Sequence, residues 1–262
     1  MNTPLLNPPC PGWQEDLPPP FTPPLIAASL GKHNPNHQDD IYLEIPRSQL
    51  RARGILLLLS LFPAGVVLAS PWLILDSIKL GMPWFTLLGI GILLLGISTT
   101  TLGIRTDTAL PRDEPIRFNR ARQKIYAYNF RCQWWKPFGK WQVVPVSYDW
   151  SQVRAERWWQ HGGSIFQWGV MLSIVEPGTH NVIDRFNLTF MGADAHAWAY
   201  VCTYMQKGPS ALPAPGPPKD HNDVLWCEFA LRLAPKVEWP ADMDRESRSA
   251  PSAIEAGWRP FC

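Results

Sequence analysis

Two uncharged, apolar segments decide the fold of this chain: GILLLLSLFPAGVVLASPWLIL at residues 54–75 and LGMPWFTLLGIGILLLGISTTTLGI at residues 80–104. As α-helices, these 22 and 25 residues are about 33 and 37 Å long, enough to cross a hydrocarbon core of about 30 Å. Only residues 76–79 separate them. We therefore predict a transmembrane helical hairpin within residues 47–104, against the alternative of two buried helices in a soluble protein.

Basic residues are concentrated at one end of this hairpin. The turn holds only Lys79, whereas the stretch 105–140 has nine Lys or Arg and three acidic residues. Arginines also precede the first segment, at Arg47, Arg51 and Arg53. By the positive-inside rule, both termini are expected in the cytoplasm. The basic stretch is expected to contact membrane lipid through anionic headgroups, each cation contributing about 1 kcal/mol to membrane binding. Direct nucleic-acid binding is the alternative and is not expected.

Small residues recur along both apolar segments. They are Gly65 and Ala69 in the first and Gly89, Gly96 and Gly103 in the second. In lipid, such residues let helices approach closely, and whether they also support a homo-oligomer stays open. Pro63 and Pro71 are expected to bend the first helix without ending it. Because neither segment contains an ionisable residue, we predict an anchor without transport or intramembrane catalysis.

The rest of the chain divides by composition. Residues 1–46 contain eleven prolines and form a proline-rich arm, expected to be either a solvated tail or an extended strap that packs on the folded part. Residues 209–262 are a second proline-rich extension, with one short helix expected over residues 224–233.

An alternating apolar pattern dominates the region between the hairpin and the second extension. It predicts strands at residues 116–118, 125–130, 142–148, 153–159, 166–175 and 182–190. A helix follows, with Asp194 as its N-cap and Gly208 at its end. The predicted fold class is therefore α+β: a transmembrane hairpin, then a cytosolic antiparallel sheet or partial barrel over residues 105–208, closed by a C-terminal helix.

No arrangement of residues predicts catalysis. The His161-Gly162-Gly163 sequence is similar to an oxyanion loop of esterases, but the G-x-S-x-G element that accompanies it is missing. Asp194 and His196 are better explained as a helix cap and a surface residue than as metal ligands. The five cysteines form no C-x-x-C pair, so reduced thiols are expected. We expect no enzyme activity, no cofactor and no metal.

Tryptophan is unusually dense, with seven indoles in residues 134–168. Two adjacent pairs, Trp134-Trp135 and Trp158-Trp159, lie in regions predicted as extended, where neighbouring side chains point to opposite faces. One ring of each pair is then expected in the core and the other on the surface. These four residues are our candidate partner-binding residues, because Trp is enriched in binding hot spots. Packing on the proline-rich arms or at the lipid interface are the alternatives.

The order of these features resembles a bacterial family of proteins of unknown function encoded beside type VI secretion effectors. The motifs that carry the resemblance are PIRFNR at 115–120, IY at 125–126, DW at 149–150, VRAE at 153–156 and FNLTF at 186–190. The resemblance implies an inner-membrane immunity protein that binds and neutralises a cognate effector or toxin, a nuclease being the expected class because the domain faces the cytosol. The alternative is a membrane-anchored accessory or scaffold protein. The layout also resembles pleckstrin-homology-like domains, an analogy of fold alone.

Overall fold

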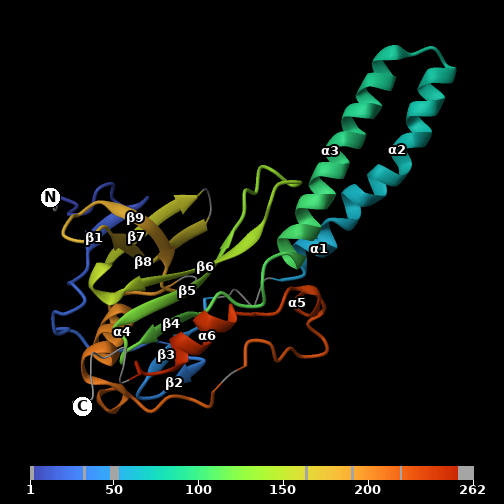
Figure 1. Ribbon diagram of the computed structural model, residues 1–262. Coiled ribbons are helices and arrows are strands. Elements are labelled where there is room, and N and C mark those ends of the chain that lie inside the picture. Colours follow the sequence, from blue (N-terminus) through green and yellow to red (C-terminus); the bar gives the residue numbers. More distant parts are fainter. Residues whose placement is uncertain are drawn as a thin grey trace, which may run out of the picture.

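The computed structural model describes residues 3–31, 34–47, 53–162, 165–189, 192–218 and 220–252. It is an α+β structure in which two long apolar helices project from a domain with two antiparallel sheets (Figure 1). The expected antiparallel strands are confirmed. The partial barrel is not, because the strands form two separate sheets instead of closing on themselves.

The first sheet has four strands in the order β1-β7-β8-β9. Their bounds are β1 Trp13–Asp16, β7 Val153–Gly162, β8 Ile165–Val175 and β9 Val182–Asn187. The predicted turn between β8 and β9 is present, with Gly178 at a φ of 75° that favours glycine. The edge strand β1 comes from the proline-rich arm and pairs with β7.

The second sheet has five strands in the order β2-β3-β4-β5-β6. Their bounds are β2 His37–Gln38, β3 Tyr42–Ile45, β4 Ile116–Asn119, β5 Lys124–Arg131 and β6 Gln142–Asp149. Strands β3 and β4 are antiparallel neighbours, with Ile45 opposite Ile116. The two long helices are therefore inserted between two adjacent strands of one sheet.

The proline-rich arm is part of this domain, so the solvated-tail interpretation is wrong for its described residues. It supplies β1 to one sheet and β2 and β3 to the other. Its prolines lie outside these short strands, where no ladder hydrogen bond is lost. The sheets consequently draw on residues outside the expected range 105–208.

The hydrophobic core includes residues from both sheets and from helix α4, Ala195–Lys207. Trp150 is fully buried, with its ring centroid 5.4 Å from that of Trp198 on α4. The Asp194 carboxylate accepts a hydrogen bond from the His196 amide at 2.9 Å, which confirms the predicted N-cap. The Trp198 indole donates to the Pro18 carbonyl at 2.9 Å, so the arm is also fixed to α4.

The projecting helices are α1, Ile55–Leu59, α2, Leu61–Lys79, and α3, Pro83–Thr108; we call them the helical pair. Ile55–Lys79 and Pro83–Thr108 are each long and apolar enough to span a membrane. Of the 18 most apolar consecutive residues in each, only 11% are buried. Pro71 lies within α2 as expected. Near Pro63 the helical hydrogen-bond pattern is interrupted at Ser60, because a proline cannot donate to the carbonyl four residues earlier. The helix does not end there: Ser60 keeps right-handed helical dihedral angles, and Ile55–Lys79 continues as one apolar span, as expected.

Three of the glycines of α3 face the preceding helices of the helical pair. A Cβ added at Gly96 would lie 2.8 Å from Val67, and one added at Gly89 would lie 2.8 Å from Ile74. At Gly103 the neighbour at 2.8 Å is Ser60. The seven-residue spacing of Gly89, Gly96 and Gly103 therefore allows close packing within the helical pair.

The C-terminal extension folds back over the second sheet. It contains α5, Phe229–Leu233, shorter than the predicted helix, and α6, Ala241–Arg248, which the sequence analysis missed. Helix α6 packs on β4 and β5. Part of the basic stretch lies beneath it: Arg117 is fully buried. Our expectation that the whole stretch 105–140 contacts lipid is therefore wrong at this residue.

Candidate functional site

The two histidines considered for catalysis, His161 and His196, make structural contacts. His196 Nδ1 lies 2.8 Å from the Ala27 carbonyl oxygen, which fixes the arm on α4. His161 packs against Phe166, with ring centroids 4.7 Å apart; Gly163 of the same motif lies outside the described residues. Within the described ranges, no group of three or more His, Cys, Asp or Glu residues is arranged to hold a metal ion.

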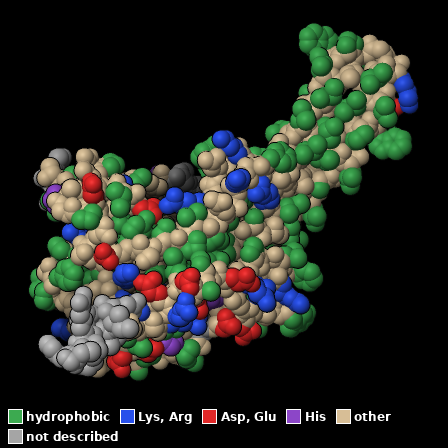
Figure 2. All heavy atoms as spheres, in the orientation of Figure 1, with side chains coloured by type: hydrophobic (Ala, Val, Ile, Leu, Met, Phe, Trp, Pro, Cys, Tyr) green, Lys and Arg blue, Asp and Glu red, His purple; other side chains and the backbone are tan. Residues whose placement is uncertain are grey.

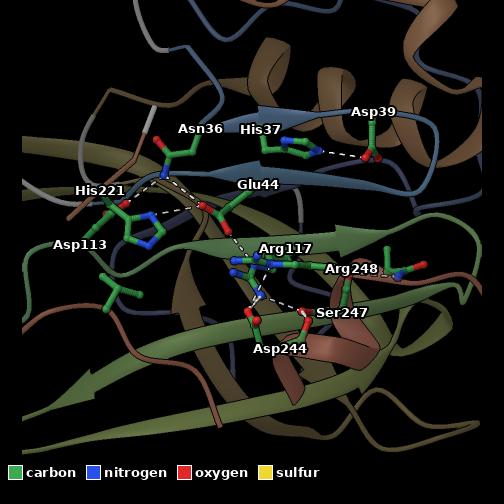
Figure 3. Close-up of polar contacts among 12 residues, drawn as sticks. Asn36, His37, Asp39, Glu44, Asp113, Arg117, His221, Asp244, Ser247 and Arg248 are labelled. Atoms are coloured by element: carbon green, nitrogen blue, oxygen red, sulfur yellow. Dashed lines mark hydrogen bonds and ion pairs between the residues drawn. The ribbon is translucent and has the colours of Figure 1, made fainter. Parts of the chain in front are cut away.

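The main buried polar cluster lies between the second sheet and α6 (Figure 3). Arg117 on β4 donates to Glu44 Oε2 on β3 at 2.6 Å and to Asp244 Oδ1 on α6 at 2.7 Å. It also donates to Ser247 Oγ at 2.8 Å. The Trp239 ring lies beneath the guanidinium, 4.6 Å from its carbon to the ring centroid. One cation thus joins two strands to the C-terminal extension.

The polar contacts of Glu44 extend this cluster. Its Oε1 accepts from Asn36 Nδ2 at 3.3 Å and lies 3.3 Å from His221 Nδ1. Burial alone would raise the pKa of Glu44, but the contacts with His221 and Arg117 outweigh it and lower the pKa to about 2. Glu44 is therefore an anion that accepts hydrogen bonds, unsuited to a general acid or base near neutral pH. We interpret the cluster as a latch that holds the C-terminal extension on the sheet.

A second buried cation, Arg47, secures the end of β3 close to the helical pair. Its guanidinium donates to the Tyr128 carbonyl at 2.9 Å and to Asn129 Oδ1 at 2.8 Å. Burial lowers the pKa of Arg47 to about 10, against the opposing effect of Glu114 and Asp113. Arg47 therefore lies inside the domain; Arg51 is outside the described residues.

The tryptophan pairs differ from each other. Trp158 is 7% exposed and Trp159 is 45% exposed, as expected for neighbours on a strand. Trp134 and Trp135 are 67% and 61% exposed, so the expectation of one inward ring is wrong for this pair. These two residues form a turn in the loop between β5 and β6, where the alternation of a strand does not apply.

The first sheet carries an uncovered aromatic strip. Val170, Leu172 and Ile174 of β8 are buried in the core. Farther along the same face of β8, Phe166 and Trp168 are about half exposed. Trp159 lies opposite Trp168 in the register, and its ring stacks on Phe166 with centroids 6.1 Å apart. We call Trp159, Phe166 and Trp168 the aromatic strip.

Sequence reasoning identified Trp159 but missed the rest of this surface. The sequence places Trp168 in the tryptophan-rich region and Phe166 at the start of a predicted strand, without marking either as a binding residue. The signal was available in the spacing, because residues 166 and 168 share the face of the apolar positions 170, 172 and 174. What could not be foreseen is that the core ends before it reaches them.

These features define a class of protein: a two-sheet α+β domain interrupted by two helices of membrane-spanning length. Residues 93–251 of the chain match a family of unknown function, DUF6708. The chain belongs to this family. The matched region begins within α3 and includes β4 to β9, α4, α5 and α6, and hence Arg117 and Asp244 of the latch. No curated protein and no solved structure matches the chain.

Proposed function

We propose that this chain is a two-span protein of the bacterial inner membrane, with both termini in the cytoplasm, that binds and neutralises a secreted antibacterial effector. The pairing of β3 with β4 supports the topology. These strands precede and follow the helical pair, and they can pair only if both emerge on the same side of the membrane. The basic residues beside them favour the cytoplasmic side.

The observation that carries the binding proposal is the aromatic strip. Three large rings about half exposed, placed on the two paired strands of one β-hairpin, are the kind of surface on which protein interfaces concentrate their binding energy. The strip continues the core face of the sheet, so a partner that covers it would extend the existing apolar packing. Occlusion of an effector requires such a surface and no catalytic group.

The topology bears on which effector is bound. A domain held on the cytoplasmic face meets toxins that act on cytosolic targets, whereas enzymes that degrade the cell wall act on the other side. A nuclease toxin is therefore the expected partner class. Neutralisation by binding is favoured over neutralisation by chemistry, because the buried polar cluster between the second sheet and α6 is engaged in the latch.

Co-expression tests this proposal. Antibacterial nuclease toxins encoded in the same genome are each co-expressed with the full chain: cells that produce the cognate toxin should survive, and the two proteins should co-purify from detergent-solubilised membranes. Trp159→Ala and Trp168→Ala should each weaken binding by about 2 kcal/mol, or thirtyfold in dissociation constant. Phe21→Ala is the matched control, because Phe21 is 59% exposed but lies in the proline-rich arm beside α4.

The outcomes separate the alternatives. Survival that is lost in the two tryptophan variants, with normal protein levels, supports an immunity role through the aromatic strip. Co-purification without survival would reassign the protein as an accessory or scaffold. If neither occurs, or if Phe21→Ala is as harmful as the tryptophan variants, the proposed binding mode is wrong.

A further inference from the structure

The loop that joins β5 to β6, residues 132–141, extends toward the base of the helical pair (Figure 1). Two turns order it, with the Lys136 amide donating to the Gln133 carbonyl and the Gly139 amide donating to the Lys136 carbonyl, both at 2.9 Å. The Trp134 and Trp135 rings meet edge to face, with centroids 5.9 Å apart. We call this segment the tryptophan loop.

Arg105 fixes the height of the tryptophan loop along α3. It is the first charged residue after the apolar segment, which ends at Ile104. Its guanidinium donates to the carbonyls of Pro137 and Gly139, the latter at 3.1 Å, and lies 4.6 Å from the centroid of the Trp141 ring. The loop is therefore held where the apolar surface of the helix gives way to polar sequence.

The side chains of the tryptophan loop suit a position at this boundary between the apolar and the polar part of α3. Trp134, Trp135 and Phe138 are 67%, 61% and 67% exposed. Lys136 and Lys140 are also exposed, and basic side chains gather beside the base of the helical pair on the face that Figure 2 shows. Indole rings and lysines together are typical of membrane–water interfaces, where the ring is partly immersed and the cation meets anionic headgroups.

A second segment at the same end of the helical pair also exposes aromatic side chains. Helix α5 packs against α3, and Arg112 donates to the Leu231 carbonyl at 3.2 Å. Ala230 and Leu231 are buried, whereas Trp226 and Phe229 are 80% and 73% exposed. Exposed aromatic side chains thus lie on two separate elements next to the base of the helices.

We propose that the tryptophan loop inserts Trp134, Trp135 and Phe138 into the headgroup region of the bilayer that the helical pair spans. The proposal rests on the membrane anchoring proposed above. It assigns this tryptophan pair to lipid and leaves the aromatic strip for the protein partner. The apolar surface of the helical pair then continues onto the loop, which fixes the orientation of the domain relative to the membrane.

Site-specific photo-cross-linking of the full chain tests this. Phe138 is replaced by p-benzoyl-L-phenylalanine, and the protein is reconstituted into phosphatidylethanolamine–phosphatidylglycerol vesicles whose lipids carry tritium in both the glycerol backbone and the acyl chains. The same replacement is made at Phe85 in α3, as a probe of membrane spanning, and at Phe21 in the arm, as an exposed control. After irradiation, tritium on the protein is compared with unirradiated samples.

We expect label at positions 85 and 138 and only background at position 21. Label at 85 without label at 138 overturns the assignment of the loop while leaving the anchoring intact. Background at both 85 and 138 overturns the membrane anchoring as well. Equal label at 21 and 138, or cross-links from 138 to a second protein chain, shows that the loop is not a specific lipid contact.

Discussion

Replacement of Arg117 by methionine should strongly destabilise the domain. The Arg117 side chain is 0% exposed and its ion-pair partner Glu44 is 6% exposed, so the substitution leaves a buried carboxylate without its main counter-ion. Asp244, 35% exposed, loses the same partner. Removing one member of a buried ion pair costs about 3–5 kcal/mol. The C-terminal extension also loses its hydrogen bonds from Arg117 to Asp244 and Ser247.

Urea unfolding of the full chain in mild detergent, followed by near-ultraviolet circular dichroism, measures this cost. Arg157→Met is the matched control, because Arg157 also lies on a strand and pairs with Glu15 at 3.2 Å, but the two side chains are 48% and 37% exposed. An exposed pair of this kind contributes about 0–1 kcal/mol. The midpoint for Arg117→Met should therefore fall well below that of Arg157→Met.

A double variant refines the test. Glu44→Gln combined with Arg117→Met removes the unpaired anion, so it should be more stable than Arg117→Met alone. If Arg117→Met costs no more than Arg157→Met, or if the double variant is the sum of the two single losses, the latch interpretation is refuted. Proteolysis between α5 and α6 should also become faster when Arg117 is replaced.

Three further predictions follow from groups described above. The folded-state pKa of Glu44 is about 2 and its ordinary value is 4.5, so the stability that this group contributes is present above pH 4.5 and is lost as the pH falls toward 2. Measurements of the free energy of unfolding across this pH range should show the loss. Glu44→Gln should flatten the pH dependence. Exposed Cys227 should react with maleimide in the native protein. Buried Cys10 and Cys202 should react only after unfolding, because burial raises their pKa values to about 12. Mass spectrometry of the labelled peptides measures both. Gly96→Leu should separate the two long helices, seen as faster proteolysis and a lower melting temperature in detergent, whereas Gly91→Leu, where nothing lies within 4 Å of the added Cβ, should have little effect.

Sequence reasoning predicted β4 to β9 and α4 because their signals are local. Alternating apolar positions with one buried face specify a strand, and Asp194 and Gly208 mark the ends of the helix that follows them. Helix α6 carried a similar signal that was overlooked. Pro240 precedes it, acidic residues occupy its first turn, and Arg245 and Arg248 lie in its last turn.

The proline-rich arm could not be placed in this way. Strands β1 to β3 are only two to four residues long. Strands β1 and β3 pair with strands that follow the helical pair, and β2 pairs with β3. The same limit applies to the candidate sites. The burial of Arg117 depends on α6, and the exposure of both Trp134 and Trp135 depends on a turn that the sequence analysis read as extended.

The insertion of two helices between neighbouring strands imposes an order on biosynthesis. The ribosome completes β3 before it makes either long helix, and β4 emerges only after both. During that interval β3 has no partner on one side, and an unpaired strand edge invites aggregation. If the helical pair spans a membrane as proposed, β3 can pair with β4 only after the second helix has returned the chain to the starting side. Assembly of the second sheet would then depend on the insertion of both helices.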